Sequence, residues 1–109
     1  MDLKELNIEK IEAICRSHYV DRLCIFGSAA SGNMKKNSDV DVLVKFSDMD
    51  LYYYLDNLLS LKTKLEKIFN RPVDILEEQA LKNPYLKNSI DRNKILIYGR
   101  KDTQKETEP

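Results

Sequence analysis

Two aspartates stand two residues apart in SDVDVLVKF, a segment with the pattern of a buried strand. Side chains two residues apart on a strand project from the same face, so the carboxylates of Asp39 and Asp41 should lie roughly 7 Å apart. Like charges at that distance repel, and one pKa rises unless a cation neutralises the pair. Mg²⁺ prefers oxygen ligands and is commonly bound by carboxylates together with nucleotide phosphates. The pair therefore indicates metal-dependent phosphoryl chemistry.

A glycine–serine pair and a third acid add to this pattern. Gly27 closes the strand-like segment DRLCIFG, where the N–H groups of a sharp turn and the Ser28 hydroxyl could bind phosphate at the start of a short helix. Asp74 lies between apolar residues in VDIL, where a carboxylate is costly unless it is paired or metal-bound. If the VDIL strand lies beside the acidic strand, three carboxylates meet at one point, as a two-metal site requires.

The elements that must position these residues follow from hydrophobic periodicity. The patterns predict a first helix that ends near Tyr19, with the apolar stripe Leu3, Ile8, Ile11, Cys15 and His18. A strand over Arg22–Phe26, the short helix after Ser28 and the SDVDVLVKF strand follow. The rest of the chain should form a long helix capped by Asp50 and ended by Asn70 and Pro72, a VDIL strand, a helix in NPYLKNSIDRN and a strand in KILIYG. The apolar stripe of the long helix comprises Leu51, Tyr54, Leu55, Leu58, Leu61, Leu65, Ile68 and Phe69. This order predicts a compact α/β domain over residues 1–100, in which helices cover a small sheet. Residues 101–109 contain no apolar residue and should form a disordered polar tail.

Composition narrows the class of protein. The chain has 109 residues, 42% of them hydrophobic, with 18 Lys and Arg against 18 Asp and Glu, which removes the general positive field of a nucleic-acid-binding protein. It lacks an apolar run of the ~20 residues that span a bilayer. We therefore expect a cytoplasmic protein with no direct contact to nucleic acid or membrane. Cys15 and Cys24 lack metal-binding spacing and should be buried, reduced thiols.

The segment FGSAASGNMKKNSDVDVLVKF resembles the signature of the polymerase-β-type nucleotidyltransferase superfamily, in which GS, a spacer and DxD precede a third Asp. The short chain, the VDIL strand and the closing KILIYG resemble the minimal nucleotidyltransferase (MNT) family, and the similarity covers about residues 20–99. This resemblance implies the nucleotidyltransferase fold with a mixed sheet. It also implies ATP as substrate, with its phosphates against Gly27 and Ser28, and two Mg²⁺ ions held by Asp39, Asp41 and Asp74.

Many MNT proteins are partners of HEPN-domain proteins in toxin-antitoxin pairs. The resemblance therefore implies an antitoxin that forms a hetero-oligomer with a HEPN-domain RNase toxin and silences it by transferring AMP from ATP to a tyrosine hydroxyl. Asp74 would also accept the proton of that hydroxyl. Two alternatives stay open: transfer to a small hydroxylated molecule such as an aminoglycoside, and an antitoxin that acts by binding alone. The chain shows no obvious second domain for a small acceptor, and its three acids argue against lost chemistry.

The chain departs from the family pattern after Ser28. Relatives often carry arginines there, in a GSRARG-like segment, whereas this chain has Ala29 and Ser31. Any arginine contact from that turn to the triphosphate or to the acceptor is therefore in doubt. Lys35 and Lys36 are candidate substitutes, although solvated loop charges are the simpler interpretation.

Three further residues have two interpretations each. Tyr52 and Tyr53, at the start of the long helix, either pack ordinarily or are exposed and meet a partner or a base. His18 is expected to cap the first helix or to lie on the surface, because the negative end of a helix dipole favours a cation. No residue that reads the base can be named from the sequence.

Overall fold

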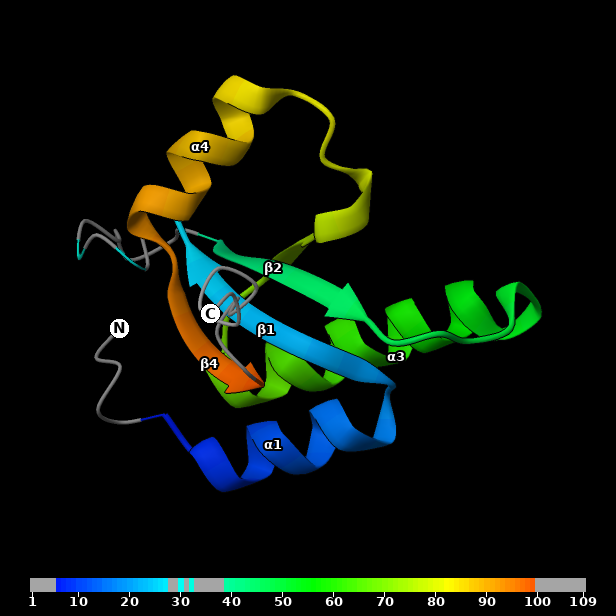
Figure 1. Ribbon diagram of the computed structural model, residues 1–109. Coiled ribbons are helices and arrows are strands. Elements are labelled where there is room, and N and C mark those ends of the chain that lie inside the picture. Colours follow the sequence, from blue (N-terminus) through cyan, green and yellow to red (C-terminus); the bar gives the residue numbers. More distant parts are fainter. Residues whose placement is uncertain (1–5, 28–29, 31, 33–38, 100–109) are drawn as a thin grey trace, which may run out of the picture.

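The computed structural model describes residues 6–27, 30, 32 and 39–99. Its elements are, in chain order, α1 (Ile8–Ser17), β1 (Val20–Phe26), β2 (Val40–Phe46), α3 (Leu51–Phe69), β3 (Val73–Glu77), the 3₁₀ helix η2 (Glu78–Ala80), α4 (Pro84–Asn93) and β4 (Ile95–Gly99). Figure 1 shows α1 and α3 beneath the sheet and α4 on its opposite side. The predicted α/β class is therefore confirmed.

The sheet has four strands in the order β3-β2-β1-β4. β1 pairs antiparallel with both β2 and β4, whereas β2 pairs parallel with β3. The parallel pair is possible because α3 carries the chain back across the sheet between β2 and β3. The mixed sheet is the one that the family resemblance implied.

Alternation along the strands divides the apolar residues between the two faces of the sheet. Val40, Val42 and Val44 of β2 are fully buried in a core shared with α1 and α3. Leu43 points the other way and forms a smaller cluster with Cys24 and Ile90 of α4. Asp41 of β2 has the same parity as Leu43, so it lies on the α4 side of the sheet.

The ends of the helices follow from their capping residues. The Asp50 side chain accepts a hydrogen bond from the Tyr52 amide at the start of α3, and Asn70 ends that helix in a left-handed conformation (φ 57°). Asn83 caps α4 in the same way, directly before Pro84. The signals predicted at Asp50, Asn70 and Pro84 are confirmed, whereas the Asn83 cap and η2 were not predicted.

The predicted apolar stripe of α3 is buried only in its second half. Leu61, Leu65 and Phe69 are buried, but Leu51 is 83% exposed and Leu55 is 60% exposed. Figure 1 shows the physical reason, since the first half of α3 extends past the end of the sheet and has no strand above it.

Smaller differences concern the ends of the first elements. α1 begins at Ile8, with Asn7 as its cap, and β1 begins at Val20, two residues before the predicted start. The predicted helix after Ser28 and the tail over 101–109 lie outside the described residues, apart from Ala30, which has helical conformation. No helix in the described part of the chain is long and apolar enough to cross a membrane. Cys15 and Cys24 are buried and free, as expected.

Candidate active site

Neighbouring strands bring two of the predicted acids together. In the parallel ladder, Asp41 of β2 is the direct partner of Asp74 of β3. The valines that precede them, Val40 and Val73, are also partners and are buried, so each aspartate projects on the opposite side from the α1–α3 core. Asp41 is half-buried, whereas Asp39 and Asp74 are exposed. The predicted neighbourhood of the two acidic strands is therefore confirmed.

Gly27 lies against one of these carboxylates. It follows Phe26, the partner of Asp41 in the antiparallel ladder, and adopts a left-handed conformation (φ 71°) that L side chains rarely take. A Cβ atom at this position would lie 2.5 Å from Oδ2 of Asp41. The carbonyl of Gly27 also accepts a hydrogen bond from the Ala30 amide at 3.1 Å, which closes a tight turn. Glycine avoids both the strain of this φ and the contact with the Asp41 carboxylate.

The acids of the site repel one another. Burial raises the pKa of Asp41, and the nearby carboxylates of Asp74 and Asp39 raise it further. The charged form of Asp41 is therefore the form that the folded chain disfavours. A bound cation would reverse this preference, which is the electrostatic property expected of a metal-binding carboxylate.

The chemistry of the donor set suits a hard divalent cation, because it consists of carboxylate oxygens at the end of a sheet. Among the described residues, no three His, Cys, Asp or Glu side chains are grouped closely enough to hold one ion. Asp39 and Asp74 are exposed and can rotate toward Asp41, so convergence of all three on a metal stays a prediction. Ser28, Ala29, Ser31, Lys35 and Lys36 lie outside the described residues.

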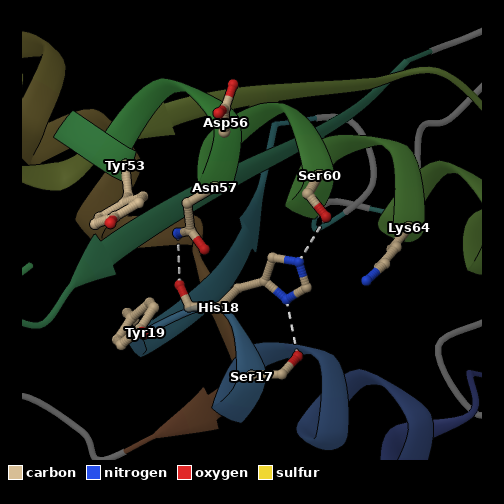
Figure 2. A pocket seen from close by; sticks show the side chains of 8 residues that line it. All are labelled: Ser17, His18, Tyr19, Tyr53, Asp56, Asn57, Ser60 and Lys64. Carbon is tan, nitrogen blue, oxygen red and sulfur yellow. Dashed lines mark hydrogen bonds between the residues drawn. The ribbon is translucent and has the colours of Figure 1, made fainter. Parts of the chain in front are cut away.

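A separate cleft of about 440 Å³ lies at the other end of the sheet, between the end of α1 and the first half of α3. Figure 2 shows its lining, with the imidazole of His18 between the two helices. His18 Nδ1 lies 2.7 Å from the carbonyl oxygen of Ile14, and Nε2 lies 2.8 Å from Ser60 Oγ. Because a carbonyl only accepts, Nδ1 carries the proton and donates it.

His18 therefore corrects one expectation and confirms another. Its amide donates to the Cys15 carbonyl, so it does cap α1, but its side chain is buried with the residue only 5% exposed. The surface alternative is wrong. The sequence did contain the signal, because His18 continues the buried stripe of Ile11 and Cys15. Tyr52 and Tyr53, in contrast, are exposed, as one of their two interpretations required.

Comparison with known proteins identifies the family. A profile described as "Polymerase beta, Nucleotidyltransferase" matches residues 9–103, which include all three acids and Gly27. The chain belongs to this family. The predicted enzyme class, a nucleotidyltransferase, is thereby confirmed.

Two relatives and two solved structures of the nucleotidyltransferase family are similar over most of the chain. A Methanocaldococcus jannaschii protein, MJ1379, provisionally named a protein adenylyltransferase, is 34% identical over 97 residues, covering 88% of this chain and 95% of the relative. The protein adenylyltransferase MntA of Thermococcus cleftensis is 31% identical over 93 residues, covering 78% and 91%. A solved structure provisionally described as a minimal nucleotidyltransferase has a TM-score of 0.72 at 34% identity, covering 87% of this chain and 95% of that one. A chain from a complex of a tri-AMPylated Shewanella oneidensis HEPN toxin with an MNT antitoxin has the same fold, with a TM-score of 0.59 at 20% identity and coverage of 94% and 75%.

Proposed function

We propose that this nucleotidyltransferase is an antitoxin that transfers AMP from ATP to a tyrosine hydroxyl of a partner HEPN-domain RNase toxin and thereby neutralises it. The register that pairs Asp41 with Asp74 carries the proposal, because it puts two carboxylates at one end of the sheet beside the Gly27 turn. Family membership and the similarity to MntA, which is named a protein adenylyltransferase, support it. The two proteins would form a hetero-oligomer.

Three acids and one turn would bind the metal ions and the nucleotide in this site. Asp39, Asp41 and Asp74 would hold two Mg²⁺ ions, while Gly27 and Ser28 would lie against the phosphates of ATP. Bound Mg²⁺ neutralises phosphate charge and lowers the pKa of the acceptor hydroxyl. The absence of a side chain at Gly27 leaves its backbone free to approach the nucleotide.

The reaction balances without a further reactant. The acceptor oxygen forms a bond to the α-phosphorus of ATP, the bond from that phosphorus to the β-phosphate oxygen breaks, and pyrophosphate leaves. Asp74 would accept the hydroxyl proton, because it is exposed and a hydroxyl of an acceptor can reach it. Positioning and neutralisation of charge supply most of the acceleration.

Exposure of the acids favours a macromolecular acceptor. Asp39 and Asp74 are exposed, so a hydroxyl presented by another protein can reach them directly. A site that is open to solvent also needs a second molecule to exclude water from the reacting phosphate. An acceptor protein meets both requirements at once.

The test uses ATP labelled in its adenosine or α-phosphate, Mg²⁺, and the HEPN protein or an aminoglycoside as acceptor. Label on a tyrosine of the HEPN protein is the expected result, and Asp41→Asn should abolish it while circular dichroism shows an intact fold. Asp48→Asn, an exposed aspartate at the far end of β2, is the matched control and should keep full labelling. Label on the small molecule, or inhibition of the toxin without any label, would replace the proposal with one of its alternatives.

A further inference from the structure

The first half of α3 carries exposed apolar side chains that nothing in the described chain covers. We define the α3 patch as Leu51, Tyr52, Leu55 and Leu59, which are 83%, 82%, 60% and 52% exposed. The three leucines recur every four residues, so they follow one side of the helix. Tyr53 supports Tyr52 through an edge-to-face contact with ring centroids 5.0 Å apart. The patch is therefore a continuous surface rather than scattered apolar residues.

The area of the patch approaches what an interface needs. At 82% exposure, Tyr52 presents about 160 Å², because an aromatic side chain carries roughly 150–250 Å². With the three leucines the surface comes to about 500 Å², within the range of about 300–600 Å² for the largest apolar patch of a monomeric protein. A standard interface buries about 800 Å² on each partner, so the patch with a modest polar rim would suffice.

The position of the patch argues against the AMP acceptor as its occupant. The candidate active site lies where β1 ends and β2 begins, whereas α3 starts after the opposite end of β2. Figure 1 shows the first half of α3 projecting beyond that opposite end. A partner on the patch therefore leaves the catalytic acids uncovered.

Charges around the patch make it complementary to itself. Asp48 precedes the patch and lines the same shallow pocket as Leu51, and Lys62 follows Leu59 on the same side of the helix. An antiparallel pairing centred on Leu55 sets Leu51 of one copy against Leu59 of the other. Asp48 lies just before α3, and this pairing brings it toward Lys62 of the other copy, which also forms an ion pair with Glu66 of its own helix at 2.9 Å.

We propose that the α3 patch is the interface of a symmetric homodimer, in which α3 packs antiparallel against α3 of a second copy around Leu55. Both active sites then face away from the interface, and each remains accessible to its acceptor. The proposal concerns the chain alone, so it holds or fails independently of the adenylyl-transfer reaction.

The first test is the mass of the full chain in solution, measured by sedimentation equilibrium over a concentration series without nucleotide or toxin. The wild type should be a dimer that dissociates on dilution. Leu55→Glu should weaken the dimer about tenfold or more, whereas Leu86→Glu, an exposed leucine of α4, should leave it unchanged. A wild type that is monomeric at every concentration overturns the proposal, and so does a dimer that Leu55→Glu does not affect.

Two further measurements test the register. Asp48→Lys and Lys62→Asp should each weaken the dimer, and the double variant should restore it, because the charges then attract again; a double variant weaker than both single variants contradicts the antiparallel pairing. Leu55→Cys should form an intermolecular disulfide under mild oxidation faster than Leu86→Cys, since Cys15 and Cys24 are buried. Equal rates for the two variants would place Leu55 away from the two-fold axis.

Discussion

The contact between Gly27 and Asp41 is tested most directly by Gly27→Ala. The added methyl would lie 2.5 Å from Asp41 Oδ2, and the backbone would keep its φ of 71°. A left-handed conformation costs an L residue about 1–2 kcal/mol, and moving the aspartate off its rotamer costs roughly another 1 kcal/mol. We expect the free energy of unfolding to fall by about 2–3 kcal/mol.

The effect of Gly27→Ala on adenylyl transfer should be larger than its effect on stability suggests. A displacement of about 1 Å at a reacting centre can cost roughly 100-fold in rate. Transfer of labelled AMP should therefore fall by about 100-fold, even at temperatures where circular dichroism shows that the variant is folded.

Gly32→Ala is the matched control for this experiment. Gly32 has a similar φ of 81°, but a Cβ there meets none of the described residues within 4 Å. The free energy of unfolding of Gly32→Ala should fall only by the cost of the left-handed backbone, about 1–2 kcal/mol. Urea denaturation of both variants, alone and combined with Asp41→Ala, isolates the contact, because Asp41→Ala should bring the cost of Gly27→Ala down to that of Gly32→Ala. If the two glycine variants are equally stable and equally active without Asp41→Ala, the reasoning is refuted.

Three other outcomes are expected. The pKa of Asp41 is raised above 3.8 by burial and by the neighbouring acids, so its contribution to stability is greatest below about pH 4 and is lost as the pH rises through the raised pKa. Asp41→Asn should therefore flatten this decline in urea titrations at several pH values. Parallel curves of stability against pH for the two proteins would contradict the prediction. His18→Ala should lower the free energy of unfolding by about 2–4 kcal/mol, since it removes a buried ring and leaves the Ser60 hydroxyl without its partner, yet labelling of the acceptor by the folded variant should persist. Alanine variants of Arg22 and Glu78, whose side chains form an ion pair with 13% and 17% exposure, should show a coupling energy of about 1–3 kcal/mol in a double-mutant cycle, and a value near zero would mean that solvent screens the pair.

Local signals accounted for most of the fold. The predicted strands and the later helices appear where the periodicity and the end signals place them, because Asp50, Asn70 and Pro84 act on the backbone within a few residues of themselves. The acidic pair and Asp74 were found from residue type and spacing. The acids were expected to lie close together if the VDIL strand is adjacent to the acidic strand, and the parallel pairing of β2 with β3 meets this condition.

Long-range packing explains what the sequence did not show. The periodicity of α3 is the same in both halves, but only the second half lies over the sheet, so Leu51 and Leu55 remain exposed. His18 is buried because Ser60, on another helix, supplies a partner for its second nitrogen. The close approach of Gly27 to Asp41 depends on the pairing of β1 with β2, which periodicity alone does not specify.

The strand order has a consequence for how activity is acquired. The hairpin of β1 and β2 can form from nearby residues and already contains Gly27, Asp39 and Asp41. Asp74 arrives only when β3, an edge strand, docks in parallel after the whole of α3 has crossed, and such distant pairings are slow to form. A chain in which β3 has not docked, or one truncated before Asp74, would therefore lack one of the proposed metal-binding acids.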